Sequence, residues 1–224
     1  FGREASAFVT KHKNRPFFLY ASFNAIHGPL QAPVKEIASA PKNPDHKRRI
    51  MAAMLTSLDR NIGRILQAVR DAKLESNTLV IFWSDNGGKP TGNRSLNTPL
   101  RGAKGQYYEG GIRVPLIIKW PGHGDAGSIC REPVISTDFY PTILDIIGVA
   151  SRPQQHCDGE SLVPLLQGET TLDREAIFWH FPHYSNHGMQ SPGGAVRCGR
   201  FKLLEYFEND TLQLFDLEAD PGES

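Results

Sequence analysis

The chain has 224 residues, of which 39% are apolar and 22% charged, and its formal net charge is +1. This length suffices for one or two domains with a sizeable core, and the balanced charge argues against a nucleic-acid-binding surface, which requires a basic face or stripe. Three widely spaced cysteines exclude a disulfide framework or a Cys-x-x-Cys zinc site, and no apolar run reaches the roughly 18 residues of a membrane span.

The first half of the chain predicts alternating helices and strands. Residues 2–13 have the pattern of the end of a helix that begins elsewhere, and the apolar run at residues 17–23 predicts a buried strand. Residues 44–74 keep an apolar stripe at spacings of three and four, which predicts a long helix, and residues 78–83 predict a second buried strand. This order predicts a right-handed crossover and a parallel sheet.

The middle of the chain contains a long loop. Residues 87–111 are rich in glycine and have no sustained period, and a loop of that length inside a compact domain is usually functional. Residues 114–120 predict another strand. Residues 139–147 predict a helix that Thr137 or Asp138 caps and that Gly148 ends.

The pattern changes near residue 173. Residues 176–181, 195–207 and 211–217 predict short strands with no helix between them. They indicate an antiparallel sheet in a small C-terminal subdomain. We therefore predict an α/β domain over residues 1–172 and a smaller α+β subdomain over residues 173–224.

An acidic corner follows the predicted strand at residues 78–83. Asp85 and Asn86 come directly after it, and Gly87 and Gly88 let the backbone turn sharply. Ligands bind beyond the carboxyl ends of strands in open α/β sheets, and carboxylate and amide oxygens are ligands that Ca²⁺ or Mg²⁺ prefers. On these residues alone, an Asx turn without any ligand is the simpler interpretation.

The downstream sequence favours a functional role for this corner. Residues 84–88 and residues 100–115 together closely resemble the signature of the sulfatase family, an Asp-Asn-Gly corner followed by Leu-Arg-Gly-(Gly/Ala)-Lys-Gly and Glu-Gly-Gly-Ile-Arg-Val-Pro. Shorter matches extend the resemblance over nearly the whole chain, at residues 16–20 with Asn24 and His27, residues 136–142, residues 158–162, Asp216-Leu217 and residues 220–223.

The resemblance is to the arylsulfatase and N-acetylgalactosamine-6-sulfatase group. It implies an alkaline-phosphatase-like α/β fold, with a parallel or mixed sheet, flanking helices and a small C-terminal antiparallel-sheet subdomain. It also implies hydrolysis of sulfate esters, a sulfated carbohydrate or aryl sulfate as substrate, and a periplasmic or extracellular location.

The resemblance assigns roles to four residues of the first half. Asp85 and Asn86 match ligands of Ca²⁺, and Lys104 matches the sulfate-binding lysine, where a compact cation between glycines suits a sulfate oxygen. His27 can donate to a sulfate oxygen or protonate the leaving alkoxide, although relatives have Pro-His where this chain has Ile26-His27. Without Asp85 and Asn86 nearby, an exposed loop lysine is the simpler interpretation of Lys104. His27 is equally well explained as a structural loop residue.

Three further residues are candidates for substrate binding. Arg101 either holds a substrate anion or forms a buried pair with Glu109. His180 and His183 flank Pro182, which breaks any helix that would align them and so argues against a metal site. Relatives of the 6-sulfatase group carry a similar His-x-Pro-His-Tyr segment near the substrate entrance, which implies a sugar contact, and simple packing explains the two histidines about equally well.

The family nucleophile has no match in this chain. It is a Cys or Ser in a Cys/Ser-x-Pro/Ala-x-Arg motif, oxidised to formylglycine, and the surroundings of Cys130, Cys157 and Cys198 do not fit it. We therefore expect the chain to be the C-terminal portion of a sulfatase, with the formylglycine and two metal-binding aspartates in an N-terminal half. The chain alone is expected to be inactive and to bind Ca²⁺ weakly.

Two alternative functions remain open. One is a phosphodiesterase or phosphonate hydrolase of the same superfamily, and the other is a non-catalytic fragment that binds sulfated carbohydrate. The nucleophile segment would distinguish them from a sulfatase. In a sulfatase, His27, Asp85 and Asn86 should emerge at the same sheet edge, and the glycine-rich loop should carry Lys104 back to them.

Overall fold

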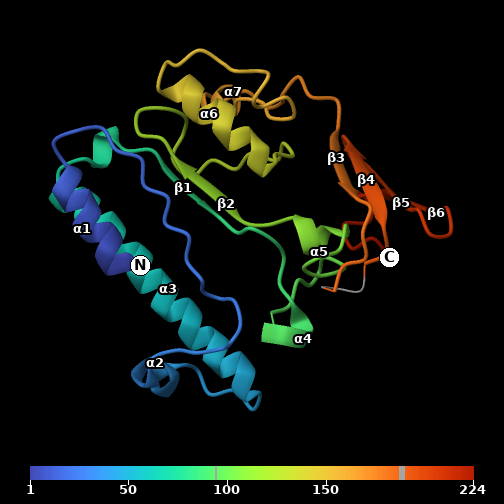
Figure 1. Cartoon of the computed structure of the whole chain (residues 1–224), viewed down its shortest axis with the longest axis horizontal. Coiled ribbons are helices and arrows are strands. Elements are labelled where there is room, and N and C mark those ends of the chain that lie inside the picture. Colours follow the sequence, from blue (N-terminus) through green and yellow to red (C-terminus); the bar gives the residue numbers. More distant parts are fainter. Residues whose placement is uncertain (94, 187–189) are drawn as a thin grey trace. The chain divides into compact units, whose positions relative to one another are not determined.

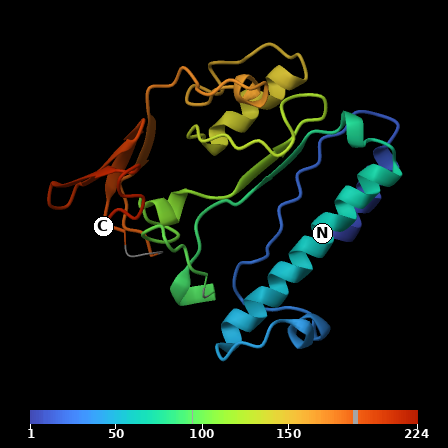
Figure 2. The ribbon, with the colours of Figure 1, turned by 180° about the vertical axis from the view of Figure 1, so that it is seen from behind.

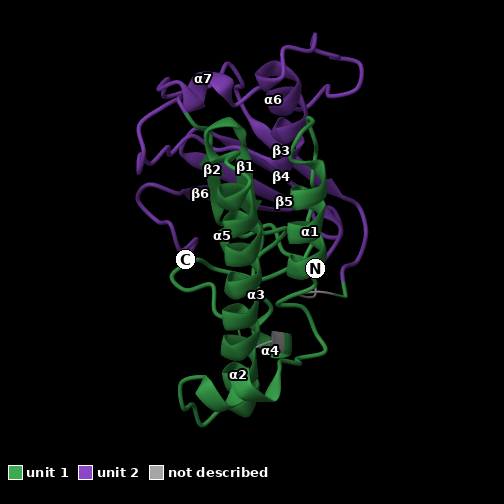
Figure 3. Ribbon diagram, turned by 90° about the vertical axis from the view of Figure 1, so that its left-hand side faces the viewer, with its two compact units in different colours: residues 1–121, 186–189 green, residues 122–185, 190–224 purple. Residues whose placement is uncertain are grey.

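The computed structural model describes residues 1–93, 95–186 and 190–224, which form two compact units (Figures 1 and 3). Among the described residues, unit 1 comprises residues 1–121 with Asn186, and unit 2 comprises residues 122–185 and Gln190–Ser224. Among the described residues of both units, no helix combines the length and the apolarity that crossing a membrane requires.

Two helices of unit 1, α1 (Gly2–His12) and α3 (His46–Asp71), pack side by side (Figures 1 and 2). The side chain of Asp45 accepts hydrogen bonds from the backbone N–H groups of Lys47 and Arg48, so α3 begins two residues later than predicted. It ends before Lys73, whose φ of 60° lies in the left-handed region. The short helix α2 (Val34–Ser39) adds an ion pair from its buried Glu36 to Arg60 of α3.

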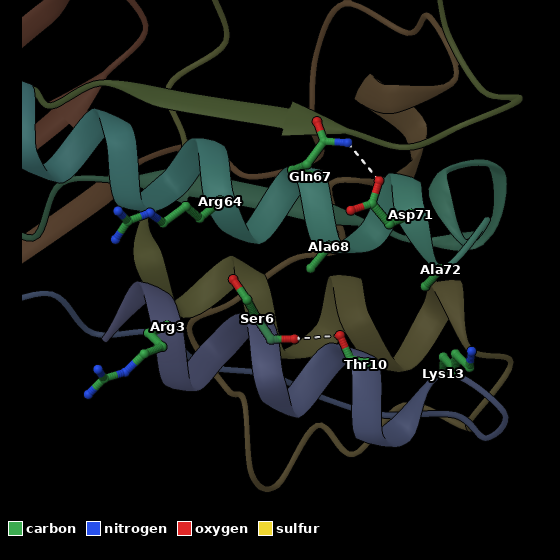
Figure 4. Close-up of a pocket in the computed structure, with 9 residues that line it drawn as sticks. All are labelled: Arg3, Ser6, Thr10, Lys13, Arg64, Gln67, Ala68, Asp71 and Ala72. Carbon is green, nitrogen blue, oxygen red and sulfur yellow. Dashed lines mark hydrogen bonds between the residues drawn. The ribbon is translucent and has the colours of Figure 1, made fainter.

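A groove of about 660 Å³ runs between α1 and α3. Figure 4 shows the small side chains of Ser6 and Ala68 between the two helices, with Arg3 and Arg64 towards one end of the groove and Lys13 towards the other. None of these residues belongs to the sulfatase motifs. The groove therefore lies outside the candidate site.

Unit 1 also holds a two-stranded sheet. Strand β1 (Val80–Trp83) pairs antiparallel with β2 (Leu116–Lys119), with Trp83 opposite Leu116. The remaining elements of unit 1 are the 3₁₀ turn Glu75–Asn77 and the one-turn helices α4 (Pro90–Asn93) and α5 (Glu109–Ile112).

The predicted buried strand at residues 17–23 is not a strand of either sheet. The segment is extended and its side chains alternate between half-buried and exposed, with Phe18 71% exposed. Its contact with β1 is made by side chains, since the ring of Tyr20 stacks on that of Trp83 with centroids 6.0 Å apart. The described strands pair only antiparallel, so the parallel crossover predicted between residues 17–23 and 78–83 was wrong in its pairing.

Unit 2 contains the predicted C-terminal antiparallel sheet. Its four strands follow one another in space as in sequence, namely β3 (Ile177–Phe181), β4 (Gly193–Cys198), β5 (Phe201–Tyr206) and β6 (Thr211–Asp216). The single strand predicted over residues 195–207 is two strands, because the chain turns at Gly199, whose φ is 53°. One face of the sheet buries Ile177, Ala195 and Leu204.

The helical part of unit 2 precedes the sheet. It consists of the 3₁₀ turn Ser136–Asp138, α6 (Phe139–Ile146) and α7 (Val163–Leu166). The mixed α/β class and the C-terminal antiparallel sheet are thus confirmed. The proposed domain boundary at residue 172 stays a prediction.

Candidate functional site

The two segments of the sulfatase signature, residues 84–88 and 100–115, are hydrogen-bonded to each other in unit 1. The backbone N–H of Gly87 donates to the carbonyl of Gly111 at 2.9 Å, and that of Ser84 donates to the carbonyl of Pro115 at 3.2 Å. These bonds attach the corner after β1 to the segment that leads into β2. Asp85 is exposed at this corner and Asn86 is half-buried.

The glycine-rich loop returns Lys104 to the same corner. The backbone N–H of Lys104 donates to the carbonyl of Gly88 at 3.0 Å. The side chain of Asn97 closes the loop, since its amide oxygen accepts from the Gly88 N–H at 2.9 Å and its amide nitrogen donates to the carbonyls of Gly88 and Gly102. The backbone of Lys104 is therefore attached to Gly88, two residues after Asn86 and three after Asp85.

Asn97 is the residue of this corner that sequence reasoning missed. Its signal in the sequence was an amide inside a loop rich in glycine and proline, where Asn commonly bonds to backbone groups. Such a side chain has several partners within reach, and its choice of Gly88 and Gly102 follows from how the loop closes. Only the tertiary structure reveals that choice.

Glycine is required at this corner because two backbone segments touch. A Cβ at Gly87 would lie 1.8 Å from the carbonyl oxygen of Gly110, and a Cβ at Gly110 would lie 2.5 Å from the carbonyl oxygen of Arg101. Both distances are far below van der Waals contact, and the obstacle is backbone in each case.

Replacing Gly87 by alanine should therefore destabilise the site and separate the two motifs. We expect a loss of about 1–3 kcal/mol in the free energy of unfolding of unit 1, as for other overpacked positions. Urea denaturation measures it. Gly63 in α3 is the control, since a Cβ there meets nothing within 4 Å and alanine should stabilise the helix by about 0.5–1 kcal/mol. Equal effects of the two substitutions would contradict the close approach.

The donor chemistry of the corner fits a hard cation in part. A carboxylate and an amide oxygen are suitable ligands for Ca²⁺, which takes about six to eight oxygens. Within residues 1–93, 95–186 and 190–224, no group of three or more His, Cys, Asp or Glu side chains is arranged to hold a metal ion. Asp85 and Asn86 thus fit part of a Ca²⁺ site, and further ligands would have to come from elsewhere.

His27 lies in a turn that follows the extended segment. Its backbone N–H donates to the carbonyl of Asn24 at 2.8 Å, and its ring Nδ1 lies 2.8 Å from the carbonyl oxygen of Gly28. The side chain is exposed. These contacts are local, and no described hydrogen bond joins His27 to the corner at Asp85, so its catalytic role stays a prediction.

Arg101 lies on the loop that carries Lys104. Its guanidinium group is stacked over the ring of Tyr108, with 4.2 Å from Cζ to the ring centroid, and its side chain is exposed. The buried carboxylate of Glu109 forms an ion pair at 3.7 Å with Arg113, the residue that follows α5. Arg101 therefore braces Tyr108, and a contact with a substrate anion stays a prediction.

The two remaining candidates lie in unit 2. His180 is in β3, with its ring centroid 5.6 Å from that of Phe207, and His183 follows β3, with its ring 5.4 Å from that of Phe181. Both histidines are exposed. They are thus available to a ligand, and each is supported by an aromatic ring.

Other residues of the matching motifs have structural contacts. Asp138 is fully buried and accepts hydrogen bonds from the backbone N–H groups of Ile135 and Glu160 and from both terminal nitrogens of Arg174, at 2.8–3.0 Å. The hydrogen bond to Asp138 raises the pKa of the Arg174 guanidinium above its usual value. Thr142 accepts from the backbone N–H of Leu162 at 2.8 Å. Residues 136–142 and 158–162 therefore hold each other in place.

Comparisons with known proteins identify the family of the chain. The sulfatase family model matches residues 1–149, and the model of the C-terminal part of N-sulphoglucosamine sulphohydrolase matches residues 103–224. A sulfatase of Formosa agariphila is 36% identical over 233 residues, which covers 93% of this chain and 41% of that protein. Human arylsulfatase H is 31% identical, covering 99% of this chain and 44% of its own length.

Solved structures show the same relationship. Ps i-CgsB in complex with k-i-k-neocarrahexaose is 35% identical with a TM-score of 0.89, and the match covers 100% of this chain and 49% of that one. A protein solved with its substrate D-glucosamine-2-N,6-O-disulfate is 29% identical with a TM-score of 0.67, over 80% of this chain and 36% of its own. The chain spans half or less of the length of these relatives. The family models and the relatives over 30% identical along nearly its whole length show that this chain belongs to the sulfatase family.

Proposed function

We propose that the complete protein hydrolyses sulfate esters and that this chain supplies part of its metal and sulfate site. The observation that carries the proposal is the hydrogen bond from the Lys104 N–H to the Gly88 carbonyl. It attaches the backbone of a cationic residue to a corner that carries an exposed carboxylate and a half-buried amide. This combination serves a ligand that is itself anionic and is bound together with a cation.

Each residue of the corner has a proposed task. Asp85 and Asn86 present oxygen atoms to Ca²⁺, which when bound would supply positive charge beside the sulfate and lower the repulsion that an incoming nucleophile meets. Lys104 donates hydrogen bonds from its ammonium group to a sulfate oxygen, where charge increases in the transition state. His27 is proposed to protonate the leaving oxygen of the substrate.

The remaining parts of the site are proposed to lie in a segment outside this chain. Two oxygen donors are fewer than Ca²⁺ takes, and the chain covers 41% of the Formosa agariphila sulfatase while that match covers 93% of the chain. A formylglycine nucleophile and further carboxylate ligands belong to that segment in our proposal. A periplasmic or extracellular location is proposed with it, on family resemblance alone.

The proposed substrate is a sulfated carbohydrate. Two similar solved structures hold a carbohydrate, one of them a glucosamine disulfate described as the substrate. The exposed histidines His180 and His183, each next to an aromatic ring, are proposed to contact the sugar. An aryl sulfate is the second candidate, because arylsulfatases are among the relatives.

The test of this function is the substitution Lys104→Ala in the complete protein. We expect kcat for a sulfate ester to fall by about 10²–10³-fold, the usual cost of removing one charge-stabilising donor. Lys42→Ala is the matched control, because Lys42 is exposed and lies outside both motifs. It should leave kcat unchanged.

The same assay separates the alternatives. This chain by itself should show no turnover above buffer. Faster hydrolysis of a phosphodiester or phosphonate than of the sulfate ester by the complete protein would favour the phosphodiesterase alternative. Binding of a sulfated sugar without hydrolysis of any of these esters would favour a non-catalytic binding protein. A Lys104→Ala variant with unchanged kcat would refute the proposed role of that residue.

A further inference from the structure

Two described arms of the loop between β3 and β4, residues 182–185 and 190–192 of unit 2, are both bonded to one carboxylate. The hydroxyl of Tyr184, on the first arm, donates to Oε1 of Glu208 at 3.0 Å. The hydroxyl of Ser191, on the second arm, donates to Oε2 of the same residue at 3.1 Å. Glu208 follows β5, so a single side chain connects this loop to the turn between β5 and β6.

Backbone hydrogen bonds fix the base of the loop, at Ser185, Gln190 and Pro192. The N–H of Ser185 donates to the carbonyl of Gln190 at 2.9 Å, and the N–H of Phe207 donates to the carbonyl of Pro192 at 3.0 Å. The base is therefore fixed by the backbone. The ring of Tyr184 is exposed, and its hydroxyl is bonded to Glu208.

The aromatic support of His180 comes from the same turn. Phe207 precedes Glu208, and its ring lies 5.6 Å from that of His180 across β4. Gly194 faces His180 in the sheet, and a Cβ there would lie 3.8 Å from the tip of the Phe207 ring. The ring of Phe207 thus lies at ordinary van der Waals distance from the position of Gly194. Phe207 thus contacts His180 of β3, and Glu208 holds Tyr184 and Ser191 on the two arms of the loop.

The sign of the charge determines what Glu208 can do. A carboxylate that touched a sulfated sugar directly would repel it, so Glu208 is unsuited to bind the substrate itself. Each of its two oxygens instead accepts one hydroxyl hydrogen bond, and hydrogen bonds to a charged group are the stronger ones. The bond to Glu208 raises the pKa of the Tyr184 phenol.

We propose that Glu208 is a positioning residue, which holds Tyr184 and the adjacent His183 in the orientation that binds a sulfated sugar. This inference rests on the proposed function and names a determinant of its substrate affinity. Holding an exposed aromatic side chain in place before binding lowers the ordering cost of association. The effect therefore falls on KM, while chemistry at the corner of Asp85 and Lys104 is unchanged.

The experiment compares four variants of the complete protein, namely Glu208→Ala, Glu208→Gln, Tyr184→Phe and Glu205→Ala. For Glu208→Ala we expect KM for a sulfated oligosaccharide to rise by about three- to tenfold, as for the loss of one or two hydrogen bonds. We expect kcat to stay within about twofold, since no group at the reacting ester is altered. Glu208→Gln should lie between this variant and the wild type, because an amide keeps one acceptor oxygen.

Tyr184→Phe and Glu205→Ala complete the comparison. Tyr184→Phe should raise KM without affecting kcat. Glu205 is the matched control, an exposed carboxylate in β5 three residues before Glu208, and its removal should leave both parameters unchanged. An equal rise of KM in Glu205→Ala would show a general charge effect and overturn the proposal.

A titration of Tyr184 distinguishes failure of this inference from failure of the proposed function. In ring-labelled protein, the phenol of Tyr184 should titrate at lower pH in Glu208→Ala than in the wild type. An unchanged titration would show that the bond to Glu208 is absent and would overturn the proposal. A lowered pKa with unchanged KM would show a purely structural contact and would also overturn it.

If the wild-type protein turns over no sulfate ester, calorimetric binding of a sulfated disaccharide replaces KM. Weaker binding by Glu208→Ala would then support the positioning role although hydrolysis had failed as a function. Equal binding by variant and wild type, or binding by neither, would overturn it.

Discussion

Replacing Asp138 by asparagine is expected to lower the free energy of unfolding of unit 2 by about 3–5 kcal/mol, the range for breaking a buried ion pair. Asp138 is fully buried, and both of its oxygens accept hydrogen bonds from Arg174, whose side chain is only 10% exposed. An amide at this position carries no charge and has one acceptor oxygen instead of two. The guanidinium group then stays buried without a neutralising carboxylate.

The loss extends to backbone groups. Asp138 also accepts from the N–H groups of Ile135 and Glu160, which come from two different motif segments. Asparagine cannot accept all four of these hydrogen bonds, so at least part of the connection between the segments is lost. We therefore expect the substitution to loosen residues 158–162 as well as to destabilise the fold.

Urea denaturation followed by the fluorescence of Trp179, which lies in β3 of unit 2, measures this effect. Substitution of Trp83 and Trp120 by phenylalanine in the background leaves Trp179 as the single reporter. Asp145→Asn is the control, an exposed aspartate of α6 that accepts a hydrogen bond from Ser161. It should cost less than about 1 kcal/mol. Similar losses in the two variants would show that burial of the ion pair at Asp138 is not what stabilises unit 2.

The secondary structure that the sequence predicts well is the part that depends on local pattern. The apolar stripe of α3 and the apolar runs of the C-terminal sheet follow from spacing within one segment. The structure contains them with shifted ends, and it divides the strand predicted over residues 195–207 into β4 and β5. Residues 17–23 have an equally apolar pattern, yet they form no ladder with β1. A strand requires a neighbouring backbone at hydrogen-bonding distance, and the pattern of one segment carries no information about that neighbour.

The candidate site shows the same division. The motif pair indicated that Lys104 returns to the corner at Asp85, and the bond from its N–H to Gly88 places it there. Asn97 and Glu208 were not predicted, because each acts by joining segments far apart in sequence or on opposite sides of a loop. A polar residue in a loop has many available partners, and the closure of the chain selects among them.

Motif recognition located residues whose roles only the structure reveals. The matching segment at residues 220–223 contains no residue of the proposed sulfate site. Its turn is held by the hydrogen bond from the N–H of Glu223 to the carbonyl of Asp220, and Glu223 is in the left-handed region with φ of 54°. This geometry directs its carboxylate into the core, where Lys202 of β5 lies 2.8 Å away. The role of this motif is therefore to place the carboxylate of Glu223 in the core beside Lys202.

Replacing Lys202 by methionine is expected to destabilise unit 2 by about 3–5 kcal/mol, because the buried Glu223 loses a cation at a site that water does not reach. Both side chains are 0% exposed, so neither charge is screened by solvent. Methionine keeps the volume and flexibility of the lysine stem and removes only its charge and hydrogen bonds. Urea denaturation followed by Trp179 fluorescence measures the loss.

A double-mutant cycle separates the ion pair from packing. The variant that carries both Lys202→Met and Glu223→Met should be less destabilised than the sum of the two single variants, because it leaves neither charge buried alone. Arg200→Met is the control in the adjacent turn, where Arg200 pairs with Asp216 at 3.0 Å and is 49% exposed. Solvent screens this pair, so its removal should cost no more than about 1 kcal/mol. Strict additivity of the two methionine substitutions would mean that Lys202 and Glu223 contribute separately, through packing alone. A positive coupling together with a small effect at Arg200 would establish that burial, rather than the number of ion pairs, determines which charges stabilise this sheet.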